Sequence, residues 1–144
     1  MIRFSRMADY GVLLLGHFAR QGDSITSTTE LAEAYHMPRS VVANLLKEFT
    51  KAELLESRRG QNGGYRLARP AAEITLLDVL NVIDGPVHLI DCAVGEDLVT
   101  ACDYEDVCPS RSPMQGVHQR IIGLLDGITL SELMQDTAPL SLGK

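Results

Sequence analysis

The residues best suited to chemistry are three cysteines, Cys92, Cys102 and Cys108, which fall within 17 consecutive positions of a 144-residue chain. They are all the cysteines of the sequence, and an odd number cannot pair completely within one chain. Their C-x9-C-x5-C spacing matches neither the C-x2-C knuckles of zinc ribbons nor the C-x-x-C motif of thioredoxin-type sites. Thiolates are suitable ligands for iron–sulfur clusters, and Cys108-Pro109 is the ending of one ferredoxin pattern. The spacing therefore favours an iron–sulfur site with three cysteine ligands and a fourth ligand of another kind.

Acidic residues surround these cysteines, and the set comprises Asp91, Glu96, Asp97, Asp103, Glu105 and Asp106. Neighbouring negative charge disfavours a bare thiolate, so these cysteines are poor candidates for nucleophiles. A bound cation would relieve the repulsion, which favours a metal centre. Zinc, redox-sensing thiols and three unligated thiols in a loop stay open as alternatives.

Positive charge is concentrated in the other half of the sequence. Residues 1–70 hold 10 Lys and Arg against 7 Asp and Glu, whereas residues 71–144 hold 3 against 12, and the whole chain carries −6. This division allows the basic half to meet a polyanion such as DNA while the acidic half faces elsewhere. Charge alone does not separate this interpretation from chance variation along a chain.

A helix predicted over residues 39–52 carries polar side chains suited to DNA. Its apolar residues recur at helical spacing from Val42 to Phe49. Its polar positions form another face, which comprises Arg39, Ser40, Asn44, Lys47 and Lys51. A short helix before it, with a capping-box spacing from Ser27 to Glu30, and a break at Pro38 complete a helix-turn-helix pattern. Side chains near the N-terminal end of the second helix of such a motif reach base edges in the major groove.

A two-stranded hairpin is predicted to follow that helix. Residues 54–59 and 65–68 read as short strands, and Gly60-Gln61-Asn62-Gly63-Gly64 makes the turn between them. The hairpin is typical of the wing of a winged helix, whose tip can enter a minor groove or touch its phosphates. Its candidate DNA contacts are Arg58, Arg59, Gln61 and Asn62. A winged helix that contacts only protein is the alternative.

The second half is predicted to contain a compact helix over residues 74–83, ended by Gly85-Pro86, and a long helix after Pro113. Apolar residues recur on the long helix at spacings of three and four, namely Met114, Val117, Ile121 and Leu124, followed by Ile128. A narrow apolar seam without an evident partner predicts a homodimer, which would present two recognition helices to a palindromic DNA site. Packing of the seam on the chain's own first helix, predicted over residues 5–21, is the alternative.

The whole chain is predicted to be mainly α. Its 45% hydrophobic and 22% charged residues are ordinary for a globular protein, and no apolar run reaches the ~18 residues of a membrane span. The start lacks a secretory pattern, so we expect a cytoplasmic protein. We divide it into a winged helix-turn-helix domain (1–86), a cysteine loop (87–113), a dimerisation helix with a short C-terminal helix (114–134) and a flexible tail (135–144). No nucleophile–base pair or phosphate loop stands out, so we expect a binding protein rather than an enzyme.

Three segments together resemble a known family: Ser5-Arg6-Met7-Ala8-Asp9-Tyr10-Gly11, the wing from Arg59 to Pro70, and Glu73 to Val79. They resemble the winged-helix iron–sulfur regulators that include IscR and NsrR, and the likeness covers roughly residues 1–126. Within that family the sequence is most similar to the proteobacterial regulators of the SUF iron–sulfur assembly operon. The resemblance implies a homodimeric transcription factor that binds double-stranded DNA. It also implies a 2Fe–2S or 4Fe–4S cluster, held by the three cysteines, whose state sets the DNA affinity.

The same resemblance bears on the fourth ligand. The C-x5-C spacing from Cys102 to Cys108 matches the family's last two cluster cysteines, whereas the gap after Cys92 is longer than in IscR or NsrR. IscR has a histidine shortly after its third cysteine, but here Pro109-Ser110-Arg111 follows. NsrR-like proteins use an N-terminal aspartate of the partner subunit, and Asp9 occupies that place. Asp9 is therefore the implied fourth ligand, with helix capping as its alternative role. The weaker candidates are His36, His88 and His118. A nitric-oxide- or redox-sensing regulator of the same fold is the alternative function.

Overall fold

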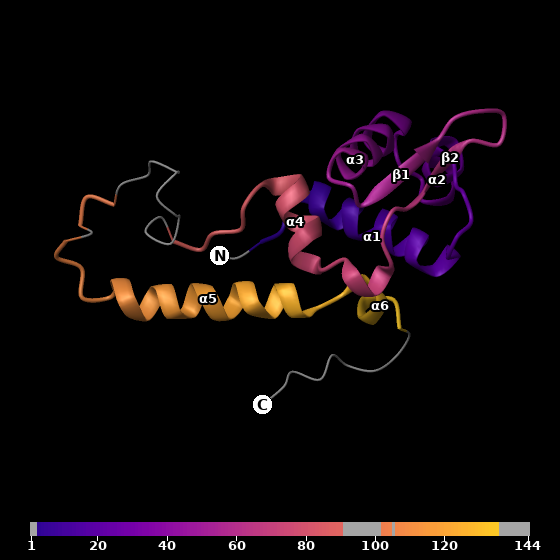
Figure 1. The fold of residues 1–144 in the computed structure, drawn as a ribbon. Coiled ribbons are helices and arrows are strands. Elements are labelled where there is room, and N and C mark those ends of the chain that lie inside the picture. Colours follow the sequence, from indigo (N-terminus) through magenta and orange to yellow (C-terminus); the bar gives the residue numbers. More distant parts are fainter. Residues whose placement is uncertain (1–2, 91–101, 105, 136–144) are drawn as a thin grey trace.

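The computed structural model describes residues 3–90, 102–104 and 106–135, and three helices come first in it: α1 (Arg6–Gln21), α2 (Thr28–Ala34) and α3 (Arg39–Lys51) (Figure 1). The hydroxyl of Ser5 caps α1 by accepting a hydrogen bond from the Ala8 N–H at 3.0 Å. The capping box predicted for α2 is present, since Ser27 Oγ accepts from the Glu30 N–H and Glu30 Oε2 accepts from the Ser27 N–H. Side-chain caps of this kind satisfy N–H groups that the first turn leaves unpaired.

The break between α2 and α3 is short. His36 adopts a left-handed backbone with φ of 52°, and Pro38 then precedes the first turn of α3. Proline suits this place because the first turn of a helix does not need its missing N–H. The predicted helix-turn-helix is thus confirmed, and the role of His36 in it is to make the turn.

The wing consists of β1 (Leu55–Arg58) and β2 (Gly64–Leu67), which pair antiparallel with Leu55 opposite Leu67 and Arg58 opposite Gly64. A third segment, which the sequence did not reveal, joins the outer side of β2. Thr26 and Tyr65 exchange two backbone hydrogen bonds of 3.0 and 2.9 Å. Thr26, which precedes the Ser27 cap of α2, therefore anchors the wing to the helix-turn-helix.

The main hydrophobic core lies between α1, α2, α3 and the base of the wing, and Ile74, Val79 and Leu130 of the second half also enter it. Phe18 of α1 and Phe49 of α3 are fully buried, and the whole predicted apolar stripe of α3 faces inward with them. Deleting a buried side chain of this size costs about 3–5 kcal/mol. The opposite face of α3 is consequently free for recognition.

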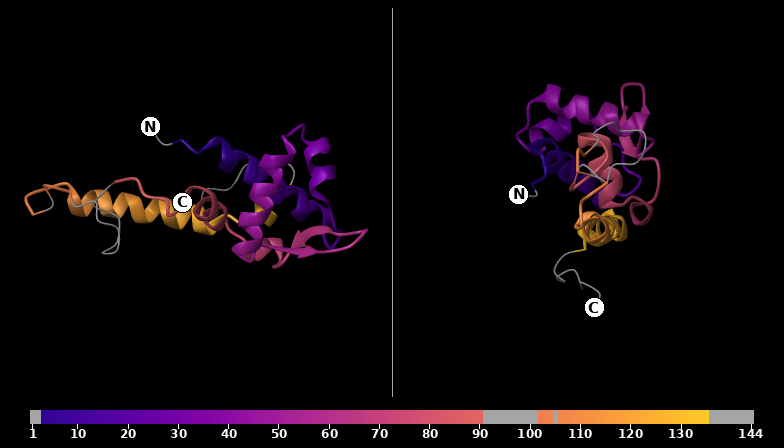
Figure 2. Two further views of the ribbon diagram at one scale, coloured as in Figure 1. Left: turned by 90° about the horizontal axis from the view of Figure 1, so that it is seen from above. Right: turned by 90° about the vertical axis from the view of Figure 1, so that its left-hand side faces the viewer.

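The second half contains a 3-10 turn (η1, Ala71–Glu73), α4 (Leu76–Asp84), α5 (Arg111–Gly127) and α6 (Leu130–Leu133). Helix α5 runs outward from the winged helix, so that its Arg111 end lies far from α1, α2 and α3 (Figures 1 and 2). Within the described ranges, no helix is both long and apolar enough to cross a membrane.

A short backbone bridge ties the other end of α5 to the winged helix. The Leu76 N–H donates to the Ile128 carbonyl and the Leu130 N–H donates to the Ile74 carbonyl, both at 2.8 Å. Each bridging segment has the pattern Ile-Thr-Leu and starts a helix with its own capping box. Ile74 and Leu130 are both buried in the main core. The base of α5 is therefore fixed to the body of the protein.

The start of the long helix differs from the predicted one, and so does the place of Ile128. Helix α5 begins at Arg111, before Pro113, because proline is compatible with a first helical turn. It ends at Gly127, so Ile128 is outside the helix and its carbonyl joins the bridge to Leu76. Ile128 is therefore not part of the α5 seam.

Candidate nucleic-acid interface and cysteine site

The outer face of α3 carries the predicted polar side chains. Arg39, Ser40, Asn44, Lys47 and Lys51 are all exposed. They lie on the side of α3 opposite the residues that enter the core. The helix thus presents an exposed surface of donors and acceptors, of the kind that reads base edges and phosphates.

Within the described residues, Lys51 is the one of these groups that forms an ion pair inside α3. Its Nζ donates to Glu48 Oε1 at 2.8 Å, and both side chains are mostly exposed. The hydrogen bond from Lys51 lowers the pKa of Glu48, and the charges of Lys51 and Lys47 act in the same direction. Because an exposed pair of this type contributes little, Lys51 stays available to a competing anion.

The wing extends beyond α3 in the direction of its turn (Figure 1). Arg58, Arg59, Gln61 and Asn62 are exposed at this tip, as a groove-entering hairpin requires. Arg66 of β2 differs from them, since its guanidinium is paired with Glu56 across the ladder. It therefore neutralises a carboxylate on the wing.

His17 holds the helix-turn-helix together from α1. Its Nδ1 lies 2.9 Å from the Tyr35 hydroxyl and its Nε2 lies 3.2 Å from Thr26 Oγ1. Tyr35 ends α2, and Thr26 pairs with the wing. Burial lowers the pKa of His17, and the charge of Glu30 opposes this in part. The sequence reasoning did not single out this residue.

Cys102 and Cys108 lie just before α5, and both are free and partly exposed. The Cys108 carbonyl accepts a hydrogen bond from the Arg111 N–H at 3.4 Å, which attaches this cysteine to the first turn of the helix. Cys92 lies outside the described residues. Among those that are described, no three His, Cys, Asp or Glu side chains come together as a metal site.

Asp9 is exposed in the first turn of α1, and it is not the helix cap, because Ser5 fills that place. The start of α1 and the cysteine end of α5 are separated in Figure 1 and in the left-hand view of Figure 2. The structure therefore does not bring Asp9 to Cys102 and Cys108 of its own chain. A role as a ligand from the partner subunit stays a prediction.

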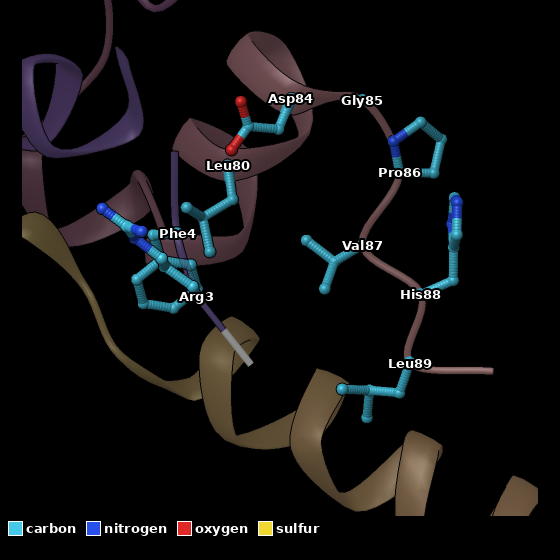
Figure 3. A pocket seen from close by; sticks show the side chains of 9 residues that line it. All are labelled: Arg3, Phe4, Leu80, Asp84, Gly85, Pro86, Val87, His88 and Leu89. Carbon is cyan, nitrogen blue, oxygen red and sulfur yellow. The ribbon is translucent and has the colours of Figure 1, made fainter. Parts of the chain in front are cut away.

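The weaker histidine candidates are also not brought to the cysteines. His88 lies at a cavity of about 350 Å³ between the N-terminal segment and the end of α4, and its imidazole points away from Phe4 and Leu80 (Figure 3). His118 is buried on α5, and no hydrogen bond to its Nδ1 is formed by the described residues. Neither Cys102 nor Cys108 lines the cavity in Figure 3.

The predicted seam on α5 divides into two parts. Met114, Val117 and Leu124 are 40%, 44% and 47% exposed. Ile121 instead packs against a second cluster formed by Ala8, Leu80 and Leu125 of the same chain. Because α5 rests on α4 and α1 through that cluster, the alternative of packing within the chain holds for Ile121. The described residues of this chain leave Met114, Val117 and Leu124 largely uncovered.

Comparison with known proteins decides the family. The sequence profile of the Rrf2 family, described as iron-dependent transcriptional regulators, matches residues 4–136. The chain belongs to the Rrf2 family. It is therefore a DNA-binding transcriptional regulator and not an enzyme, as the sequence predicted.

The Rrf2 chain also has similar relatives and solved structures. The protein aau3 of Rhizobium meliloti (strain 1021) is 30% identical over 134 residues, which are 93% of this chain and 86% of the relative. CymR, the global cysteine regulator of B. subtilis, has a TM-score of 0.74 and 23% identity, covering 96% of this chain and all of that one. IscR of T. potens has a TM-score of 0.71 and 24% identity, covering 99% of this chain and 93% of that one. These structural likenesses confirm the predicted winged-helix fold, which the chain shares with CymR and IscR.

Proposed function

We propose that this Rrf2-family protein binds a palindromic DNA site as a homodimer, and that an iron–sulfur cluster on its cysteines sets its DNA affinity. We further propose that it controls genes for iron–sulfur cluster assembly, which extends the resemblance to the SUF regulators. The observation that carries the DNA part is the exposed polar face of α3 together with a wing that starts beside α3 and extends beyond it with exposed Arg58 and Arg59. This arrangement suits the major groove and an adjacent backbone or minor groove.

The side chains divide into two roles on DNA. Arg39, Ser40 and Asn44 lie in the N-terminal part of α3, from which short and planar side chains reach base edges. Lys47, Lys51 and the wing arginines Arg58 and Arg59 supply positive charge for phosphates. Gln61 and Asn62 at the wing tip add hydrogen-bonding groups.

The donor set near α5 fits an iron–sulfur cluster. Cys102 and Cys108 are free thiols, and Cys92 supplies a third in the sequence. When bound, such a cluster would supply a centre that responds to iron and oxidants and links the thiolates to one another. We propose 2Fe–2S or 4Fe–4S with these three cysteines and Asp9 of the partner subunit as ligands. The acidic residues near the cysteines would then face a positively charged metal centre rather than one another.

The fold offers a route from the cysteines to the DNA-binding face. The Cys108 carbonyl accepts a hydrogen bond from the first turn of α5. The last turn of α5 leads into the backbone bridge with Ile74 and Leu76. A change in the order or position of the cysteine segment would therefore move α5 and, with it, the spacing of two winged helices in a dimer. Such a two-state shift needs only a few kcal/mol of differential stabilisation.

A thiol-based regulator without a cluster is the second candidate. The observation that favours it is that Cys102 and Cys108 are free and partly exposed. Partly exposed thiols are open to oxidation in a way that buried ones are not. The two candidates share the DNA-binding face and differ in iron content.

Substitutions on α3 test the DNA-binding function. We expect Lys47→Gln to weaken binding to all sequences and to lower the slope of log K against log salt by about 1, because one phosphate contact is lost. Asn44→Ala should instead cost about 1–3 kcal/mol at a preferred sequence and relax the preference at one position. Fluorescence anisotropy against a set of duplexes, at several salt concentrations, measures both. If neither substitution changes binding, the assigned DNA face is wrong.

A further inference from the structure

We propose that the groove between α3 and the wing binds one phosphate of the DNA backbone, with the hydroxyls of Ser57 and Tyr65 as hydrogen-bond donors beside Lys47 and Lys51. The inference rests on the DNA-binding function proposed above and adds Ser57 and Tyr65 to it. The groove is lined by Lys47, Thr50, Lys51, Ser57 and Tyr65. Three of these residues come from α3 and two from the wing.

The geometry of the two elements places these side chains together. Residues 47, 50 and 51 are three and four positions apart and share one stripe of α3. Ser57 and Tyr65 lie directly opposite each other in the ladder, so their side chains leave the same face of the hairpin. Leu55 and Leu67 lie two positions along on that face, and Leu55 is buried in the core. This face of the hairpin therefore begins in the core at Leu55 and reaches the groove beside α3 at Ser57 and Tyr65.

The opposite face of the hairpin carries different chemistry. Glu56 and Arg66 are the intervening ladder partners, and they form an ion pair with each other. Side chains alternate between the two faces of a strand, so this carboxylate points away from the groove. The groove face of the wing therefore offers hydroxyl groups without a carboxylate between them.

The hydroxyls of Ser57 and Tyr65 are available as donors. Within the described part of the chain, no hydrogen bond is formed by either hydroxyl. The Thr50 hydroxyl is different, because it donates to the Leu46 carbonyl at 2.7 Å and so presents mainly its methyl group. The Tyr65 ring and the lysine stems add further apolar surface, against which a deoxyribose can pack. Hydroxyl and ammonium donors around such a surface suit a sugar–phosphate unit.

Glu48 is the acidic group that opposes this binding. Its carboxylate holds the Lys51 ammonium at 2.8 Å at the edge of the groove. A phosphate must therefore compete with Glu48 for Lys51, whereas Lys47 has no such competitor among the ion pairs of the described residues. Removing the charge of Glu48 should free Lys51 and strengthen the binding of DNA.

The test uses a 30-base-pair duplex of mixed sequence at low salt, because a phosphate contact does not depend on the operator. We expect Ser57→Ala and Tyr65→Phe each to weaken binding roughly 3- to 10-fold, as for the loss of one ordinary hydrogen bond at an exposed site. The salt slope should stay unchanged, since a neutral hydroxyl displaces no counterion. We expect Glu48→Gln to tighten binding several-fold and to enlarge the effect of Lys51→Gln.

Two control substitutions remove a tyrosine hydroxyl and a positive charge outside the groove. Tyr104→Phe removes a hydroxyl from an exposed ring near the cysteines, and Arg120→Gln removes an exposed charge from α5. Both should bind the duplex as the native protein does, and circular dichroism confirms that all variants fold. The phosphate site is wrong if Ser57→Ala and Tyr65→Phe bind like the native protein while Lys47→Gln does not. It is also wrong if their effects change with base sequence. A native protein that binds no duplex at all overturns the DNA-binding function itself.

Discussion

Short polar side chains at helix starts determine much of this fold. The sequence predicted the capping box of Ser27, and Thr75 and Thr129 turn out to form two more. Both have an acidic residue three positions later, so the same pattern could have located them. Each hydroxyl cap contributes about 1 kcal/mol. What the pattern could not reveal is that Thr75 and Thr129 are also neighbours, because their backbone bridge joins segments 54 positions apart.

His17 leads to a prediction about pH. Burial lowers its pKa below the ordinary 6.5, so the unfolded chain takes up a proton more readily than the native protein as the pH falls. The contribution of His17 to stability is therefore full above pH 6.5 and declines as the pH drops toward its lowered value. We expect His17→Gln to cost roughly 1 kcal/mol at neutral pH, through the lost bonds to Tyr35 and Thr26.

The measurement is urea unfolding of the native protein and His17→Gln at several pH values. The difference in their free energies of unfolding should shrink as the pH falls below the ordinary histidine pKa of 6.5. Carboxylates remote from His17 titrate equally in both proteins and cancel in this difference. Glu30 interacts with His17, but its pKa is lowered from the ordinary 4.5, so its titration lies at lower pH. A difference that grows as the pH falls would contradict the assigned shift.

At the scale of elements, the order of helices and strands could be predicted from the sequence. The contacts between these elements could be predicted only in part. The helical period of α3 and the glycine-rich turn of the wing are local signals, and both elements formed within a few residues of their predicted bounds. The pairing of Thr26 with Tyr65 is non-local and leaves no period in the sequence. The seam of α5 is ambiguous for the same reason. A period of three and four identifies an apolar face without saying which partner covers each residue.

Gly63 gives a prediction for the wing. A Cβ added there would lie within 3.0 Å of backbone atoms of Gly60, and even closer to the Arg58 carbonyl oxygen. Backbone atoms cannot move aside as a flexible side chain can, so Gly63→Ala must distort the turn. We expect it to cost about 1–3 kcal/mol of stability and to weaken the binding of a duplex.

Gly116→Ala is the matched control on α5, where nothing lies within 4 Å of the added Cβ. This change should stabilise the protein by about 0.5–1 kcal/mol, because alanine favours the helix. Thermal unfolding compares the two variants. Equal effects of the two substitutions would show that the turn tolerates a side chain at position 63.

At the scale of the whole molecule, the candidate DNA-binding face and the cysteine segment are at different ends. Helix α5 spans the distance between them (Figures 1 and 2). The charge division in the sequence predicted two different surfaces. It could not predict how far apart they lie, because that distance follows from the length and direction of α5. Asp9 of the same chain is likewise separated from Cys102 and Cys108, so its proposed role as a ligand requires Asp9 of the partner subunit.

Dimerisation through α5 can be tested by changing its exposed apolar residues. We expect Val117→Glu and Leu124→Glu to produce monomers, because buried unpaired carboxylates would face each other across a two-fold interface. Sedimentation equilibrium measures the mass of each variant. Gln119→Glu is the control, since it adds the same charge at an exposed polar position of the same helix. If Val117→Glu and Leu124→Glu remain dimers, the exposed α5 residues are not the interface.

The most direct test of the central claim is the DNA affinity of protein prepared without oxygen, before and after removal of its iron. The duplex is selected from random sequence by the native protein, and the comparison includes Cys102→Ala. We predict that native protein contains iron and sulfide and that removing them changes its affinity at least tenfold, or about 1.4 kcal/mol. Cys102→Ala should hold little iron and show no such change. Native protein that lacks iron and sulfide, or binds the duplex equally tightly before and after the treatment, would contradict the claim.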